Sequence, residues 1–216
     1  MIPDENRPPL DPHPLSDYVA WAGRRNRDPI LNLLQTKLPK DEGNILELAS
    51  GSGMHINYFA PHFPHLIFQP SDRSDETFEH IRKLRNEQQN SNVADPIVLD
   101  LTDASTWPEE GVYLAMFCIN IFQVAPVSVA IGMMACAARL LAADGFLLIY
   151  GPFMVNGRFT TPSNEEFHNL LRSTGIPEWG LKDVADLHHA AQAHGLTLAE
   201  QIDMPANNFA LIFRRG

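Results

Sequence analysis

The residues best suited to chemistry surround a glycine-rich turn after a short apolar run. The run Ile45–Ala49 leads directly into SGSGMHI, and a helical pattern follows. A strand-to-helix turn of this kind lets backbone N–H groups approach a ligand closely. Glu47 lies on the run, and Gly51 and Gly53 form the turn. A carboxylate there can accept a hydrogen bond from an ammonium group and would repel phosphates, so the pattern favours a zwitterionic amino-acid tail as the ligand.

Two common nucleotide-binding motifs fit this turn poorly. The dinucleotide fingerprint GxGxxG requires a third glycine, and Ile56 stands in its place. The P-loop requires Lys followed by Ser or Thr after the glycines, and neither follows here. A NAD-type oxidoreductase therefore remains only a second enzyme interpretation.

Two more acidic residues lie where a nucleoside would need them. Asp72 stands nineteen residues after Gly53, a spacing at which an acid can accept hydrogen bonds from ribose hydroxyls. Asp100 follows the apolar run Ile97–Leu99, where an adenine amino group could donate to it. Ligands of open α/β sheets bind at the carboxyl ends of the strands, and all three acids are expected at that edge. Each acid alone could instead cap a helix.

Alternating apolar runs and helical patterns predict an α/β domain with a mostly parallel sheet. A first helix is expected from Asp28, with Asp28 as its cap and Pro29 in the first helical position. Strands are predicted at 45–49, 66–69, 97–99, 112–119 and 146–150. The helices between them are predicted at 55–63, 75–89 and 127–141.

The pattern changes after Tyr150. A loop over 151–164 precedes helices at 165–173 and 181–194 and strands at 196–202 and 209–213. The short MPANN connection between the last two strands predicts that the final strand is antiparallel. Residues 1–14 contain five prolines and predict an extended arm, which leaves 15–216 as a single domain.

Composition narrows the function classes. The chain has 216 residues, 44% of them hydrophobic, and a net charge of −10, which argues against broad binding of nucleic acid or anionic membrane. Cys118 and Cys136 lie in apolar surroundings, which is typical of buried thiols in a reducing compartment. The sequence contains no Cys/His cluster, so no metal site is predicted. We expect a cytoplasmic protein with a small-molecule substrate, and the pattern allows a homodimer.

The sequence resembles the class I S-adenosylmethionine (SAM)-dependent methyltransferases and, more narrowly, the methyltransferase-like protein 26 family. The matching stretches are RNRDPIL, ILELASGSGMHINYFA, QPSD, CINIFQVAP, GFLLIYGPF, TPSNEEF, PEWGLKD and MPANNFALIFRR. The resemblance implies a Rossmann-like seven-stranded sheet with helices on both faces, an antiparallel last strand, and SAM as cofactor. The SAM contacts it implies, with their immediate neighbours, are Glu47, Ala49, Gly51, Gly53, Asp72, Asp100, Leu101 and Asn120.

The sequence departs from that family in two places. Members often carry a histidine where Gln123 stands, and the strand GVYLAMF lacks the usual opening aspartate. A non-catalytic SAM-binding regulatory or scaffold protein therefore remains an alternative to an enzyme. Asn26, before the first predicted helix, is expected to fold over the cofactor as a lid.

Methyl transfer needs alignment of the nucleophile and exclusion of water, and a base only where the acceptor must lose a proton early. The expected catalytic candidates are Tyr150, Gln123 and His168. Arg158 is a cation that could bind an anionic substrate group. The expected substrate-binding residues are Phe153, Asn156, Arg158, Asn164, Asn207 and Asn208.

Overall fold

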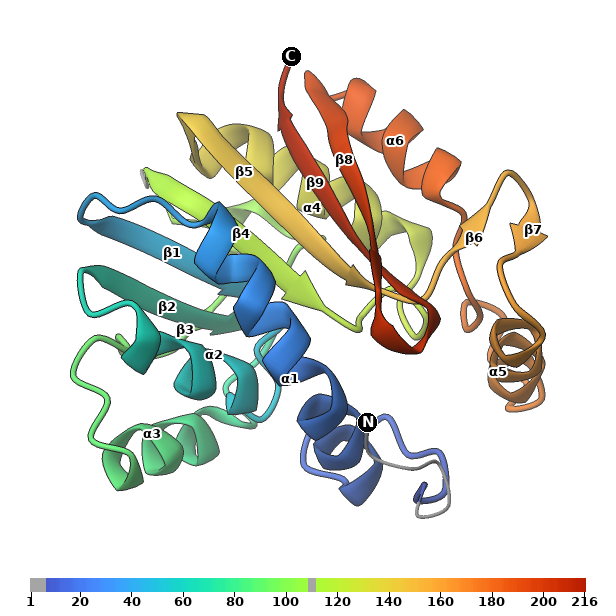
Figure 1. Cartoon of the computed structure of the whole chain (residues 1–216), viewed down its shortest axis with the longest axis horizontal. Coiled ribbons are helices and arrows are strands. Elements are labelled where there is room, and N and C mark those ends of the chain that lie inside the picture. Colours follow the sequence, from blue (N-terminus) through green and yellow to red (C-terminus); the bar gives the residue numbers. More distant parts are fainter. Residues whose placement is uncertain (1–6, 109–111) are drawn as a thin grey trace. The chain divides into compact units, whose positions relative to one another are not determined.

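A computed structural model describes residues 7–108 and 112–216. Seven strands form a sheet in the order β3-β2-β1-β4-β5-β9-β8, flanked by helices (Figure 1). The last strand, β9 (Asn208–Arg215), is antiparallel to β5 (Leu141–Gly151) and to β8 (Leu196–Met204). The predicted Rossmann-like fold class, with its mostly parallel sheet and antiparallel last strand, is confirmed. The chain divides into two compact units after Leu99.

The first unit contains three parallel strands. The end of β1 pairs with β2, with Glu47 opposite Pro70, and Ser71 and Asp72 of β2 pair with β3. Parallel pairing brings the carboxyl ends of β1 and β2 to one edge, where the acidic residues were expected. The elements are α1 (Asp17–Lys37), β1 (Gly43–Leu48), α2 (Met54–Phe59), η2 (Ala60–His62), β2 (Leu66–Asp72), α3 (Phe78–Glu87) and β3 (Ile97–Val98).

The first helix begins earlier than the sequence pattern predicts. It starts at Asp17, where Ser16 caps it by accepting a hydrogen bond from the Val19 N–H, and Pro29 lies inside it. The predicted start at Asp28 is therefore wrong. A proline inside a helix costs about 3 kcal/mol, but α1 buries Ile30 and Leu34 completely, and that burial outweighs the cost.

The predicted N-terminal arm is only partly described. Residues 7–14 contain no helix or strand, whereas residues 1–6 lie outside the described residues. The extent of the domain, 15–216, stays a prediction.

The second unit contains a parallel β4–β5 pair and the antiparallel pairs made by β9. Helix α4 packs against α6, and α6 against β8. The elements not yet named are η3 (Ala104–Thr106), β4 (Tyr113–Ile119), α4 (Val127–Leu140), β6 (Met154–Val155), β7 (Arg158–Phe159), α5 (Pro162–Arg172), α6 (Val184–Gln192) and η4 (Pro205–Asn207).

The segment 151–164 is not the continuous loop that its composition predicts. Strands β6 and β7 form a hairpin there, joined by Asn156 (φ 53°) and Gly157 (φ 73°). Two consecutive residues with positive φ are the requirement of a type I′ turn, for which Asn-Gly is strongly preferred. The Asn-Gly pair in MVNGRF is the sequence signal for this hairpin.

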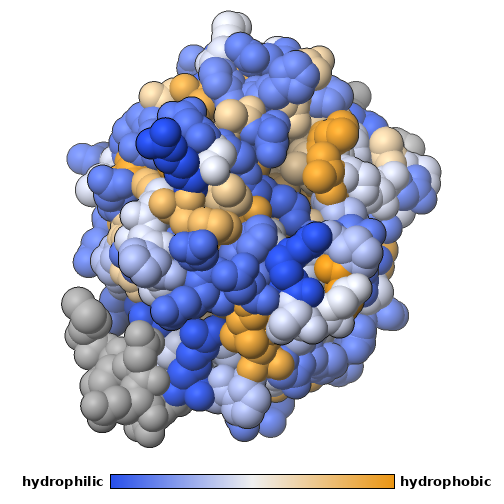
Figure 2. Space-filling model, turned by 90° about the vertical axis from the view of Figure 1, so that its right-hand side faces the viewer, coloured by the Kyte–Doolittle hydropathy of each residue, from blue (hydrophilic) through white to orange (hydrophobic). Residues whose placement is uncertain are grey.

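On the face shown in Figure 2, hydrophobic residues form small separate patches within a largely hydrophilic surface.

No helix within 7–108 and 112–216 combines the length and the apolar character that crossing a membrane requires. Cys118 and Cys136 are both buried, as predicted.

Candidate functional site

The glycine turn of the first unit depends on left-handed backbone conformations. Ala49, Gly51 and Gly53 have φ values of 53°, 52° and 72°. A Cβ atom at Gly53 would lie 2.8 Å from Cγ1 of Ile81 on α3. Position 53 therefore needs glycine both for its backbone angle and for the close approach of α3.

The carboxyl group of Glu47 is buried directly before this turn. Its side chain is 2% exposed, and its Oε2 atom has no hydrogen-bond partner among the described residues. Burial raises the pKa of Glu47 to about 8. Ser71, which the sequence did not single out, donates its hydroxyl to the Glu47 backbone carbonyl over 2.7 Å and holds this strand end in place.

Asp72 lies beside the same turn. One carboxylate oxygen accepts a hydrogen bond from the Gly51 N–H over 2.8 Å, and the other accepts from the Arg73 N–H over 2.8 Å. Partial burial raises the pKa of Asp72 above its usual range. Each carboxylate oxygen can accept more than one hydrogen bond, so Asp72 can fix the turn and still accept from a ligand hydroxyl.

Asn26 lies buried inside α1, so the prediction that it precedes the first helix is wrong, and it connects α1 to the helix that follows the glycine turn. Its Oδ1 atom accepts a hydrogen bond from Nε2 of His55 over 2.7 Å. Burial lowers the pKa of His55 to about 4, so the ring is neutral near pH 7 and carries its proton on Nε2. The histidine was not among the predicted site residues, and the contact shows how α1 is held over the start of α2.

In the second unit, Asp100 and Leu101 form a tight turn. A carboxylate oxygen of Asp100 accepts hydrogen bonds from the backbone N–H and the hydroxyl of Thr102, each over 2.7 Å. A Cβ atom at Gly132 of α4 would lie 1.7 Å from the Leu101 carbonyl oxygen. The turn is therefore fixed both by its own side chains and by the backbone of α4.

Asn120 and Gln123 lie close together after β4. Asn120 has φ 57° and donates its N–H to the Tyr150 carbonyl over 2.9 Å, and its backbone carbonyl accepts a hydrogen bond from Nε2 of Gln123 over 2.8 Å. A Cβ atom at Gly151 would lie 3.6 Å from Oδ1 of Asn120 and 3.8 Å from Oε1 of Gln123. The structure therefore brings these two side chains together at the ends of β4 and β5.

Two aromatic candidates near this point are core residues. Tyr150 is 2% exposed and Phe153 is 1% exposed, and Phe153 packs near Phe122 with ring centroids 6.5 Å apart. Packing is therefore an observed role of both side chains, and a catalytic role for Tyr150 stays a prediction.

Two predicted asparagines tie the start of α5 to the turn before β9, and a third bonds within that turn. Asn164 donates to the Asn207 carbonyl over 3.0 Å, and Asn207 donates to the Ser163 hydroxyl over 2.9 Å. Asn208 donates to the Pro205 carbonyl over 3.1 Å. These bonds account for the asparagines structurally, and substrate binding by them stays a prediction.

The remaining candidates are dispersed over the β6–β7 hairpin and α5. Asn156 lies in the hairpin turn and Arg158 stands exposed on β7. On α5, Nδ1 of His168 accepts a hydrogen bond from the Leu181 N–H over 3.1 Å, and burial lowers the pKa of His168. The neutral ring therefore carries its proton on Nε2, and a role as a base would require that Nδ1 lose its present donor.

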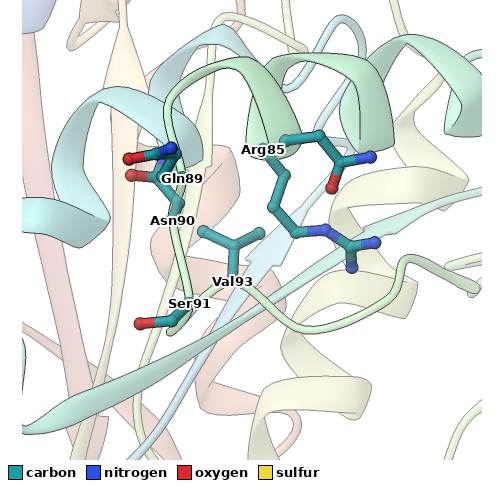
Figure 3. A pocket seen from close by; sticks show the side chains of 6 residues that line it. Arg85, Gln89, Asn90, Ser91 and Val93 are labelled. Atoms are coloured by element: carbon teal, nitrogen blue, oxygen red, sulfur yellow. The ribbon is translucent and has the colours of Figure 1, made fainter.

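A hollow of about 410 Å³ lies elsewhere in the first unit (Figure 3). Figure 3 shows Arg85 on one side of the hollow and Gln89, Asn90 and Ser91 on the other. Asn90 and Arg85 already bond to the Asn57 carbonyl and to Asp95 respectively, so they serve the fold. None of the predicted site residues lines this hollow. Within 7–108 and 112–216, no group of His, Cys, Asp and Glu is arranged to hold a metal ion.

Three solved structures with the same fold are methyltransferases by name. An O-methyltransferase family protein from Burkholderia thailandensis is 19% identical, with a TM-score of 0.76 over 93% of this chain and 59% of the other. CalO1, a methyltransferase of calicheamicin biosynthesis in its SAH-bound form, is 14% identical, with a TM-score of 0.74 over 92% and 56%. The mitomycin 7-O-methyltransferase MmcR is 12% identical, with a TM-score of 0.75 over 92% and 56%.

These similarities define the fold and the extent of the match. The chain spans less than two thirds of the length of each of these structures. A family model covers nearly all of the described chain, from residue 17 to residue 215. The chain therefore belongs to the family described as protein of unknown function DUF938.

Proposed function

We propose that this protein is a SAM-dependent methyltransferase that acts on a small-molecule acceptor. The observation that carries the proposal is the buried Oε2 atom of Glu47, which has no partner among the described residues and lies next to the glycine turn. An unpaired buried polar atom is costly. The ammonium group of the methionyl part of SAM would supply the missing donor.

The neighbouring residues fit the rest of that cofactor. Gly51 and Gly53 keep the turn free of side chains, and Asp72 retains the capacity to accept hydrogen bonds from ribose hydroxyls. The phosphates of NADH would meet a carboxyl-lined turn without the third glycine of their usual motif. Ala49 and Asn26 complete the proposed cofactor set of the first unit, and Asp100, Leu101 and Asn120 of the second unit stay predicted cofactor contacts.

SAM, when bound, supplies an electrophilic methyl group. The protein would align the acceptor and exclude water from it. The amide of Gln123 is not a base, and His168 carries its proton on Nε2 in the present arrangement. An acceptor whose nucleophilic atom needs no early deprotonation therefore fits these residues best.

The comparisons support this proposal in a general way. The three structures described above are methyltransferases by name, one of them of calicheamicin biosynthesis and one a mitomycin 7-O-methyltransferase. We also propose membership of the narrower methyltransferase-like protein 26 family, on the basis of the YGPF, SNEEF and PANN stretches. A cytoplasmic location is part of the same proposal.

Calorimetry with SAM and with NADH tests the cofactor. We expect SAM to bind and NADH to give no heat. Glu47→Gln should bind SAM about tenfold more weakly or worse, because it removes a charged hydrogen bond of about 1.5–3 kcal/mol. Glu166→Gln, which makes the same change at an exposed position of α5, is the matched control. Binding of NADH without binding of SAM would refute the proposal.

Transfer of label from SAM to a metabolite extract tests catalysis separately. Appearance of a labelled small molecule, lost in Glu47→Gln and kept in Glu166→Gln, is the expected result. SAM binding without transfer to any fraction of the extract would favour the non-catalytic alternative.

A further inference from the structure

A second pocket, of about 360 Å³, lies within the second unit, and we call it the cation pocket. Three basic side chains line it, His168 and Arg172 from α5 and Lys182 from the loop before α6. Its volume is within the range of small-molecule sites. The other lining residues are Val127, Pro177, Glu178, Trp179, Gly180 and Leu181.

The two permanent cations are held by backbone carbonyls of the loop. Arg172 donates from one guanidinium nitrogen to the carbonyls of Pro177 and Trp179. The Lys182 ammonium donates to the carbonyls of Glu178 and Gly180. Within 7–108 and 112–216, no carboxylate forms a salt bridge with either side chain. The cations are therefore fixed in position but not neutralised by a paired acid.

Several N–H donors remain available in the cation pocket. The Arg172 guanidinium keeps the N–H groups of its other two nitrogens, and the Lys182 ammonium keeps one. The neutral His168 ring adds its Nε2–H, because Nδ1 accepts from the Leu181 N–H. Burial, and to a smaller extent the neighbouring charge of Arg172, lower the pKa of Lys182.

The rest of the lining indicates the shape of a ligand. Val127 and Trp179 add apolar surface beside the cations, and Glu178 is an exposed carboxylate at the rim. An anion with an apolar body would satisfy both parts of the lining. Charge-assisted bonds from a guanidinium and an ammonium are the usual means by which proteins bind carboxylates and phosphates.

The cation pocket is joined to the loop between β4 and α4. The Gly180 N–H donates to the backbone carbonyl of Gln123 over 2.9 Å. A Cβ atom at Gly180 would lie 3.0 Å from Cε1 of His168, so the loop fits closely between the two catalytic candidates. Arg158, the cation that the sequence singled out, does not line this pocket.

We propose that the cation pocket binds a small organic oxyanion through Arg172, Lys182 and Nε2–H of His168, with its apolar body against Trp179 and Val127. The identity of this oxyanion rests on the proposed function: it is the carboxylate or phosphate head group of the methyl acceptor. The protein's net charge of −10 makes such a localised positive site necessary for an anionic substrate.

Titrations of the full chain with benzoate, phenyl phosphate, inorganic phosphate and benzamide test this proposal. The readout is the nuclear magnetic resonance signal of the Trp179 indole N–H, assigned by its loss in Trp179→Phe. We expect benzoate or phenyl phosphate to shift this signal saturably, and neutral benzamide to bind about tenfold more weakly. Preference for phenyl phosphate over benzoate identifies a phosphate head group, and the reverse identifies a carboxylate. Equal binding of benzamide and benzoate, or no saturable shift with any anion, would overturn the proposal.

Variants separate the cation pocket from general charge effects. Lys182→Met should weaken binding of the anion about tenfold. Lys83→Met makes the same change at an exposed lysine of α3 and should leave the affinity for the anion unchanged. Arg172→Gln and Lys182→Met also remove bonds to the loop, so Glu178→Gln supplies a variant that removes none of them. It should tighten anion binding about twofold to fivefold by removing a repulsive charge at the rim. Equal weakening in Lys83→Met, or an unchanged affinity in Glu178→Gln, would count against the pocket.

SAM calorimetry on the same samples keeps the two proposals distinguishable. If SAM binds but no anion does, only the cation pocket is refuted. If an anion binds as expected but SAM does not, the methyltransferase proposal and the acceptor assignment fall, and an anion site remains.

Discussion

Asp72 accepts the backbone N–H of Gly51 over 2.8 Å across the ends of two neighbouring parallel strands. The bond joins the acid at the end of β2 to the turn after β1. Asp72, which is proposed to accept hydrogen bonds from the ribose, therefore also shapes the proposed cofactor turn. Loss of this carboxylate should therefore affect both binding and stability.

Asp72→Ala should weaken SAM binding by about 1–3 kcal/mol, since ribose hydroxyls and the Gly51 N–H would lose a partly buried acceptor. It should also lower the melting temperature, whereas Asp72→Asn should keep much of the stability. Calorimetry and thermal unfolding measure the two effects. Asp103→Ala removes an exposed carboxylate that caps a short 3-10 helix, and it serves as the control. Unchanged SAM affinity in Asp72→Ala would mean that Asp72 serves the fold alone.

Gly53→Ala should destabilise the protein more than Gly195→Ala. The two glycines have φ values of 72° and 71°, so the backbone penalty for a left-handed alanine is matched. Nothing lies within 4 Å of a Cβ atom at Gly195, whereas a Cβ atom at Gly53 would lie 2.8 Å from Ile81. The difference in the free energy of unfolding isolates the steric cost, which we expect at about 1–3 kcal/mol. Equal destabilisation would show that Ile81 moves aside freely.

The cofactor side was accessible to sequence reasoning because its residues follow from topology. Glu47, Gly51 and Asp72 sit at ends of parallel strands, and the ends of neighbouring parallel strands must meet at one edge. The start of α1 was missed because a Ser16 cap and buried apolar residues outweigh the unfavourable Pro29. In that case tertiary packing decided, and local propensity did not.

The cation pocket could not be predicted in the same way. Arg172 and Lys182 meet because the loop 177–182 folds back on α5 and offers its carbonyls to both. No sequence spacing predicts that path. The sequence does carry a signal for the β6–β7 hairpin, because Asn156-Gly157 is a recognised turn pair. The surrounding segment is rich in other loop-forming residues, and it was therefore predicted as a continuous loop.

The pH dependence of stability should report on Glu47. Its pKa is about 8 in the folded protein and near 4.5 when unfolded, so the folded state retains a proton that the unfolded state loses. The stabilisation by this proton is complete below about pH 4.5 and is lost as pH rises to about 8, by at most about 1.4 kcal/mol per pH unit. Denaturant unfolding of the wild type and of Glu47→Gln at pH 5 to 8 should therefore show the wild type losing stability relative to the variant. Parallel curves would contradict the buried, protonated state.

SAM binding should release a proton for the same reason. The cofactor's ammonium favours the ionised carboxylate, so Glu47 should lose its proton on binding near pH 7. Calorimetry in buffers with different ionisation enthalpies measures the release, and Glu47→Gln should abolish it. Affinity should rise from pH 6 toward 8 in the wild type. Binding heats that are independent of the buffer would show that Glu47 does not meet the ammonium.

The carboxylate of Asp183 connects two elements beside the cation pocket. One oxygen accepts the Ala185 N–H over 2.8 Å and caps α6, and the other accepts the Gly157 N–H over 2.6 Å and holds the β6–β7 hairpin. Met154 strengthens this junction by donating its N–H to the Lys182 carbonyl over 2.9 Å. Removing the carboxylate should therefore loosen the hairpin, the helix start and the adjacent Lys182 together.

Asp183→Ala should lower the free energy of unfolding by about 1–3 kcal/mol, the cost of a lost helix cap and a second lost acceptor. Amide hydrogen exchange at Gly157 should become faster, because its N–H would have no acceptor in the folded state. Asp186→Ala removes an exposed acid from the first turn of the same helix and controls for the loss of helix-dipole stabilisation. Anion binding in the cation pocket should weaken in Asp183→Ala and stay unchanged in Asp186→Ala, since only the first loosens the segment that positions Lys182. Faster exchange at Gly157 in both variants would instead assign the effect to α6 as a whole.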